Sequence, residues 1–184
     1  MSKYLKTTII ILVSILAGCT FNSKLANHEV SKSNDEVKYE DFIFRLVSEK
    51  EKYHVGEEVR LYGEVEYVGE KDEVKVPLSA TIFSLKEMVR DYEIRDRRTE
   101  EIAEDGVLTA TTLKQGEPYR IDYEKSGTTK GSDTESYRKF IRRFVQRDGF
   151  PPGYYVMTGY TEFLIGEKPE KVKLEAKIDF KIVE

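Results

Sequence analysis

The sequence contains one cysteine, two histidines and no tryptophan in 184 residues. A single cysteine excludes a disulfide bond within the chain, whatever compartment the protein occupies. Structural and catalytic zinc sites use several histidine or cysteine ligands, and the chain has too few of them for such a site. The acidic residues do not have the spacing of an EF-hand calcium loop. We therefore expect no metal ion.

Signatures of catalysis and of nucleotide binding are also missing. The chain has no Gly-x-Ser-x-Gly elbow, no Gly-x-x-x-x-Gly-Lys phosphate loop and no dinucleotide fingerprint. His54 is the only histidine after residue 37, and it lies beside a turn at Gly56. A packed or turn-facing histidine is the simpler interpretation. The sequence thus predicts a protein that is not an enzyme and has no cofactor.

The charge pattern argues against a nucleic-acid partner. Charged residues make up 35% of the chain, both signs are interspersed, and the formal net charge is −4. Nucleic-acid-binding domains are usually basic overall. This composition predicts a well-solvated protein surface and no nucleic-acid binding.

The N-terminus has the features of an export signal. Two lysines, Lys3 and Lys6, precede an apolar run from Ile9 to Ala17. That run has the length of a signal-peptide core and is shorter than the about 20 residues needed to span a bilayer. It ends in the stretch LAGC, from Leu16 to Cys19.

This stretch resembles the lipobox of bacterial lipoproteins. The resemblance implies a signal peptide over residues 1–18, cleavage before Cys19, and a diacylglyceryl group on the Cys19 sulfur, often with a further acyl chain such as palmitate on its amino group. Two or three acyl chains give stable anchoring, whereas one chain is marginal. We expect a lipoprotein on the extracytoplasmic face of the cell membrane. The alternative is a buried core cysteine behind an uncleaved membrane segment.

Residues 19–36 are predicted to form a lipidated, flexible tether. From Phe21 to Glu36 the sequence is polar and has no periodic pattern, which is typical of a linker. Residues 37–184 have a length suited to one domain, and we find no internal repeat or second linker.

Alternation of apolar and polar residues predicts that this domain is mainly β. In the clearest case Val59, Leu61, Val65 and Tyr67 share one strand face. Similar patterns occur in 42–47, 74–85, 107–113, 119–123, 155–163 and 173–182. About seven to nine such strands with turns between them favour an antiparallel, immunoglobulin-like β-sandwich.

One segment has a helical period instead, and we expect one helix inserted between late strands. Ser132 and Glu135 have the spacing of a capping box, and Gly149 is the expected end. One side of the helical wheel collects apolar residues: Tyr137, Phe140, Ile141, Phe144 and Val145.

The other side of this helix is basic. Between Arg138 and Arg147 the chain has five basic residues and no acidic one: Arg138, Lys139, Arg142, Arg143 and Arg147. One interpretation is a solvated surface, or one paired with acids between Tyr92 and Asp105. The other is a docking face for a polyanion near the anchor, such as phospholipid headgroups, an anionic wall polymer or an acidic protein.

Two short motifs resemble the intracellular proteinase inhibitor (BsuPI) family of Bacillus. They are LKQGEPY, from Leu113 to Tyr119, and PGYYV, from Pro152 to Val156. The resemblance spans roughly Glu58 to Thr158 and implies an immunoglobulin-like sandwich. In such a fold Tyr154 or Tyr155 would form a tyrosine corner, with its hydroxyl bonded to nearby backbone. The export signal, the missing tryptophan and the basic helix depart from the family pattern, so no inhibitory residue is carried over.

These observations favour a membrane-anchored, non-catalytic binding or scaffolding module. Its partners would be the membrane, through the lipid anchor, and an unidentified protein or cell-envelope polymer. The alternative is a proteinase inhibitor or another regulator of an extracellular enzyme. Stoichiometric inhibition of a secreted bacterial protease would favour that alternative.

Overall fold

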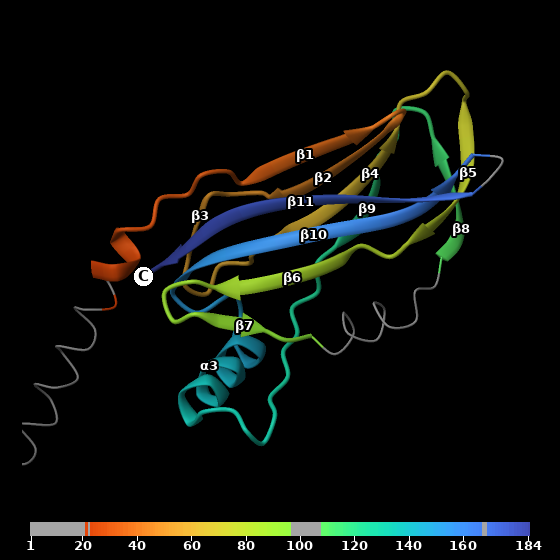
Figure 1. Cartoon of the computed structure of the whole chain (residues 1–184). Coiled ribbons are helices and arrows are strands. Elements are labelled where there is room, and N and C mark those ends of the chain that lie inside the picture. The colour runs from red at the N-terminus through yellow and green to blue at the C-terminus, as the bar shows by residue number, and fades with distance from the viewer. Residues whose placement is uncertain (1–20, 22, 97–107, 167–168) are drawn as a thin grey trace, which may run out of the picture.

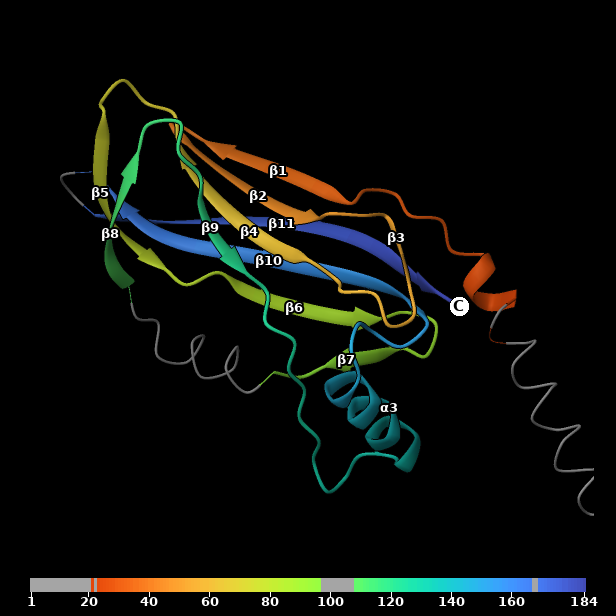
Figure 2. The same cartoon turned by 180° about the vertical axis from the view of Figure 1, so that it is seen from behind.

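The computed structural model describes residues 21, 23–96, 108–166 and 169–184. Two β-sheets pack against each other, and helix α3 (Glu135–Gln146) lies between strands β9 and β10 in the chain (Figures 1 and 2). The predicted fold class, a mainly β sandwich with a helix inserted among the late strands, is confirmed.

The first sheet has the strand order β1-β2-β4-β9, and all of its pairs are antiparallel. Its strands are β1 (Asn34–Tyr39), β2 (Phe42–Ser48), β4 (Leu61–Tyr67) and β9 (Tyr119–Asp122). In β4 every second residue is buried, as the alternation in the sequence predicts. The buried side chains of Phe44 and Val65 therefore face the second sheet.

The second sheet has the order β3-β11-β10-β5-β8. Its centre is a long antiparallel hairpin of β10 (Gly153–Ile165) and β11 (Glu170–Val183), in which Gly153 pairs with Ile182. Strand β3 (Lys52–His54) pairs with β11 in parallel. This one pair departs from the antiparallel arrangement that the sequence predicts, because alternation within a strand shows which face is buried and not the direction of the neighbouring strand.

One edge of β10 is shared by two consecutive strands. Strand β6 (Ile82–Glu87) pairs with the first half of β10, whereas β5 (Glu73–Ser79) pairs with it only at Leu78 and Phe163. Beyond that point β5 forms a ladder with β8 (Leu108–Lys114), and β6 pairs with β7 (Tyr92–Ile94). In both views β5 and β8 lie at the end of the sandwich opposite to α3 (Figures 1 and 2).

Helix α3 covers an aromatic cluster at its end of the sandwich. Phe144 contacts Phe150 with ring centroids 4.7 Å apart, and Phe150 contacts Tyr155 at 5.3 Å. The helix begins after Thr134, whose side chain accepts a hydrogen bond from the amide of Tyr137. The predicted cap Ser132 is thus wrong by two residues. Val145, predicted for the buried side, is 43% exposed.

The N-terminal segment is held against the domain over most of its length. Residues 23–26 form a helical turn in which Leu25 is buried, and the ring of His28 stacks on Tyr154 at 4.6 Å. Further on, the amide of Lys32 donates to the Asp179 carboxylate, and Asp35 accepts from the amide of Lys177.

The expected flexible tether over residues 19–36 is therefore wrong for its described part, since strand β1 already begins at Asn34. Residues 19, 20 and 22 lie outside the described residues. Polar composition suggested a linker, but hydrogen bonds to carboxylates and backbone of β11 fix this segment in place. Such long-range polar contacts have no periodic signature in the sequence.

Candidate functional site

A groove of about 300 Å³ lies between α3 and the loops that flank β7 and β10. We call it the α3 groove. Four basic side chains and one carboxylate line it, and aromatic and proline rings form much of the remaining wall. The basic residues are Arg90, Lys139, Arg143 and Arg147, the acid is Asp148, and the aromatic residues are Tyr92, Phe140 and Phe150.

Arg90 is fixed in the wall of this groove. The carboxylate of Glu87, which is fully buried, accepts hydrogen bonds from the amides of Val89 and Arg90 and pairs with the Arg90 guanidinium at 3.2 Å. Arg90 also donates to the carbonyl oxygen of Pro152 at 3.0 Å. Because the Glu87 carboxylate balances its charge, Arg90 adds little free positive charge to the groove. Its main role is to form part of the groove wall.

Helix geometry divides the predicted basic face into two groups. Lys139 and Arg143, four residues apart, lie on the side of α3 that borders the groove, and Arg147 follows at the helix C-terminus. Arg138 and Arg142 do not line the groove. Arg138 instead pairs with Glu135 at 3.4 Å and donates to the carbonyl oxygen of Gly131 at 3.2 Å.

The groove cations are largely unpaired. Lys139 is 3.8 Å from Glu135, and both side chains are more than half exposed, so this contact contributes little. Within the described residues the side chains of Arg142, Arg143 and Arg147 form no ion pair. The predicted pairing with acids between Tyr92 and Asp105 falls mostly on residues 97–105, which lie outside the described residues.

The start of the described chain reaches the same groove. The Arg90 guanidinium lies over the ring of Phe21 at 4.0 Å and near the ring of Phe140 at 5.4 Å. Such cation–π contacts hold a guanidinium flat on an aromatic face. Sequence reasoning missed Arg90 as a groove residue and Phe21 as its contact, because neither belongs to the helical period that revealed the basic face.

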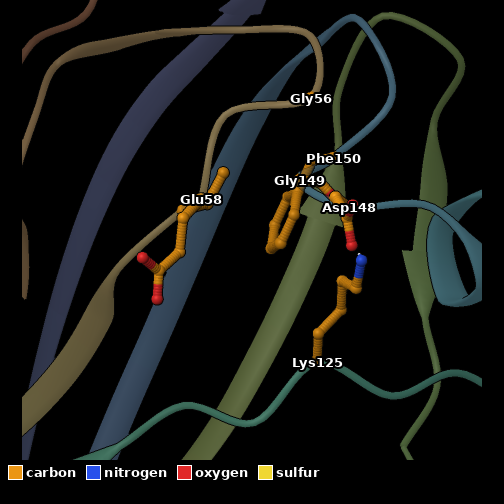
Figure 3. Close-up of a pocket in the computed structure, with 7 residues that line it drawn as sticks. Gly56, Glu58, Lys125, Asp148, Gly149 and Phe150 are labelled. Atoms are coloured by element: carbon orange, nitrogen blue, oxygen red, sulfur yellow. Dashed lines mark hydrogen bonds between the residues drawn. The ribbon is translucent and has the colours of Figure 1, made fainter.

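A second pocket, of about 490 Å³, lies on the other side of Asp148 and Phe150. Figure 3 shows Lys125 extending toward Asp148 and Gly149 there, while the carboxylate of Glu58 points elsewhere. The Lys125 ammonium donates to the carbonyl oxygens of Arg147 and Gly149. Burial lowers the pKa of Lys125, and the Asp148 carboxylate opposes this shift.

Lys125 is thus a cap for the C-terminus of α3, where carbonyl oxygens lack helical partners. Its hydrogen bonds leave this second pocket without a free cation among its lining residues. The α3 groove is the better candidate for a binding site, because Arg143 and Arg147, which line it, form no ion pair within the described residues.

The other predicted residues give no second site. His54 lies in β3, and its ring nitrogen Nδ1 contacts the carbonyl oxygen of Glu184 at 3.1 Å. In the described residues there is no cluster of three histidine, cysteine or acidic side chains that could hold a metal ion. The described helices also include none that is long and apolar enough to cross a membrane. Cys19 lies outside the described residues.

No family model matches this sequence, and no curated protein matches it at a significant level. The resemblance of its short motifs to the proteinase inhibitor family therefore stays an interpretation of the sequence.

Proposed function

We propose that this protein is an extracytoplasmic lipoprotein, anchored to the cell membrane through Cys19, whose domain is a non-catalytic binding or scaffolding module for an anionic partner. The anchor rests on the stretch from Leu16 to Cys19 behind the apolar run. The observation that carries the binding role is the α3 groove, where Arg143 and Arg147, which form no ion pair within the described residues, and the weakly paired Lys139 border aromatic walls.

The chemistry of this groove suits recognition. Guanidinium groups stay protonated at neutral pH and offer donors in a fixed planar geometry that matches phosphates and carboxylates. Lys139 adds a mobile ammonium at the rim. Cations at a helix C-terminus are also favoured by the helix dipole, so Arg143 and Arg147 stabilise α3 while they remain free for a ligand.

The anchor is tested by metabolic labelling in a bacterium with a palmitate analogue. Wild-type chain should be labelled and shortened by removal of residues 1–18. The Cys19→Ala chain should be unlabelled and should keep its signal peptide, because no other cysteine can form a thioether. Thr20→Ala is the matched control and should behave as wild type. Lipid labelling of the Cys19→Ala chain would contradict the proposed anchor.

The proposed location and partner are tested on intact cells. A protease added outside should digest the domain, and crosslinking followed by mass spectrometry should recover a component of the cell envelope that carries anionic groups. Replacing Lys139, Arg143 and Arg147 by Gln should abolish that capture. A protected domain, or capture that does not depend on these residues, would argue against the proposed function.

A further inference from the structure

The proposed anchor is close in the sequence to a residue that contacts the wall of the α3 groove. Cys19 is only two residues before Phe21. Phe21 in turn lies on the Arg90 guanidinium in the groove wall. A lipid on Cys19 would therefore enter the bilayer close to this groove.

The segment that follows Phe21 is attached to the domain, so it cannot act as a long linker between the domain and the membrane. His28 stacks on Tyr154, and Ser31 and Lys32 bind Asp179. These contacts fix the start of the described chain relative to β10 and β11. Figures 1 and 2 show that the described chain begins at the end of the sandwich that carries α3. A lipid on Cys19 would therefore hold the domain near the membrane surface with this end nearer to it.

The groove itself has the chemistry of a headgroup site. The cations Lys139, Arg143 and Arg147 line the groove beside the Asp148 carboxylate. Arg143 and Arg147 form no ion pair within the described residues, and Lys139 has only an exposed contact of 3.8 Å with Glu135. Phe140 and Phe150 supply apolar walls. Cations suit a phosphate diester, and apolar walls suit the glycerol and the first methylenes beneath it. An anionic phospholipid presents both groups.

We infer that the α3 groove binds the phosphate group of an anionic phospholipid, so that the domain lies against its own membrane with α3 toward the headgroups. This inference rests on the proposed lipid anchor, which brings Phe21 to the bilayer. Strands β5 and β8 are then directed away from the headgroups.

The test uses the absence of tryptophan from the sequence. The full chain with Gln146→Trp carries a reporter at an exposed position among the helix cations, and the chain with Thr112→Trp carries one at an exposed position in β8. Each chain is reconstituted into vesicles of phosphatidylglycerol or of phosphatidylcholine that contain brominated acyl chains, which quench nearby tryptophan fluorescence.

Quenching of the reporter at residue 146 is expected in phosphatidylglycerol vesicles only. It should disappear at about 1 M salt, where the Debye length is about 3 Å. Changing Lys139, Arg143 and Arg147 to Gln should weaken docking about a hundredfold, since three basic side chains at an anionic surface are removed. The matched control replaces Lys38, Lys114 and Lys177, which are exposed on strands, and should dock as wild type.

Two results would overturn the inference. One is equal quenching at residue 146 in both lipids, or in the groove variant and the wild type. The other is a reporter that responds to soluble inorganic polyphosphate while phosphatidylglycerol vesicles leave it unquenched. Repeating the measurement on the Cys19→Ala chain, which keeps its apolar N-terminal run, separates the two proposals. If the Cys19→Ala chain still docks on phosphatidylglycerol vesicles, the groove inference holds even where the proposed lipid anchor is wrong.

Discussion

Asp179 in β11 holds Ser31 of the N-terminal segment through two hydrogen bonds: the Ser31 amide donates to Oδ2 at 2.7 Å and the Ser31 hydroxyl donates to Oδ1 at 2.8 Å. The amide of Lys32 and the hydroxyl of Tyr154 donate to the same carboxylate. Asp179 is only 4% exposed, and a buried carboxylate is stable there because these donors satisfy it. One side chain thus attaches the N-terminal segment to the second sheet.

The first prediction concerns the pH dependence of this attachment. Burial alone would raise the pKa of Asp179, but hydrogen bonds from Tyr154, Ser31 and Lys32 outweigh it and lower the pKa. The folded state then binds fewer protons than the unfolded state, so the contribution to stability is complete at neutral pH. It is lost as the pH falls from about 4 through the lowered pKa.

Asp179→Asn should lower the free energy of unfolding by about 2 kcal/mol at neutral pH, because the bonds lose their ionic acceptor. The difference from wild type should shrink as the pH falls from about 4 through the lowered pKa of Asp179, because the wild-type carboxylate then becomes protonated too. Urea denaturation at several pH values measures both effects. Glu175→Gln, on the exposed side of the same strand, is the control and should change little. A difference that stays constant down to acid pH would contradict this prediction.

The second prediction separates the two tyrosines of the PGYYV motif. The buried Tyr155 donates to the carbonyl oxygen of Pro151 at 2.8 Å, and it is therefore the corner residue. Tyr154 instead donates to the Asp179 carboxylate. Tyr155→Phe should cost about 1 kcal/mol, and Tyr154→Phe should cost about 2 kcal/mol because its acceptor is charged. Only the Tyr154→Phe effect should fade at acid pH in denaturation experiments.

The third prediction concerns the turn after α3. Gly149 has a φ of +64°, and a Cβ at this position would lie 2.4 Å from the carbonyl oxygen of Glu57. Gly116 also has a positive φ, +70°, but a Cβ there would meet no atom within 4 Å. Gly116→Ala should cost about 1 kcal/mol from backbone strain alone, whereas Gly149→Ala should cost clearly more. Equal melting temperatures for the two variants would be the contrary result.

The fourth prediction tests where α3 begins. Thr134→Ala removes the side-chain acceptor for the Tyr137 amide and should cost about 1 kcal/mol. Ser132→Ala, at the position that the sequence pattern favoured, should leave the melting temperature unchanged. Circular dichroism at 222 nm follows the helix during unfolding. A larger effect from Ser132→Ala than from Thr134→Ala would contradict Thr134 as the cap and favour Ser132.

Much of the fold follows from local patterns in the sequence. Apolar alternation predicted β2, β4 and the β10–β11 hairpin, because each strand buries one face and its side chains alternate every two residues. The period of 3.6 residues found α3 and its basic side for the same reason. Both signals come from burial that the strand or helix imposes on its own residues.

The candidate site could be predicted only in part. The sequence identified Lys139, Arg143 and Arg147, because their spacing places them together on the exposed side of a helix. It could not select them over Arg138 and Arg142, since the choice depends on where the loops around β7 and β10 pass. Arg90 and the segment from Phe21 gave no signal at all.

The sequence by itself therefore determined the longer strands of the domain, the helix, its charged face and the expectation of a lipid anchor at Cys19, but not the strands β1, β3 and β7. The tertiary structure alone decided that the presumed tether is attached to Asp179, that Tyr155 is the corner, and that the chain start lies at the groove. The reason is physical. Hydrophobic periodicity is a local property that each segment carries in its own residues, whereas a polar group finds its partner only after distant segments have packed, and the partner leaves no trace in the neighbouring sequence.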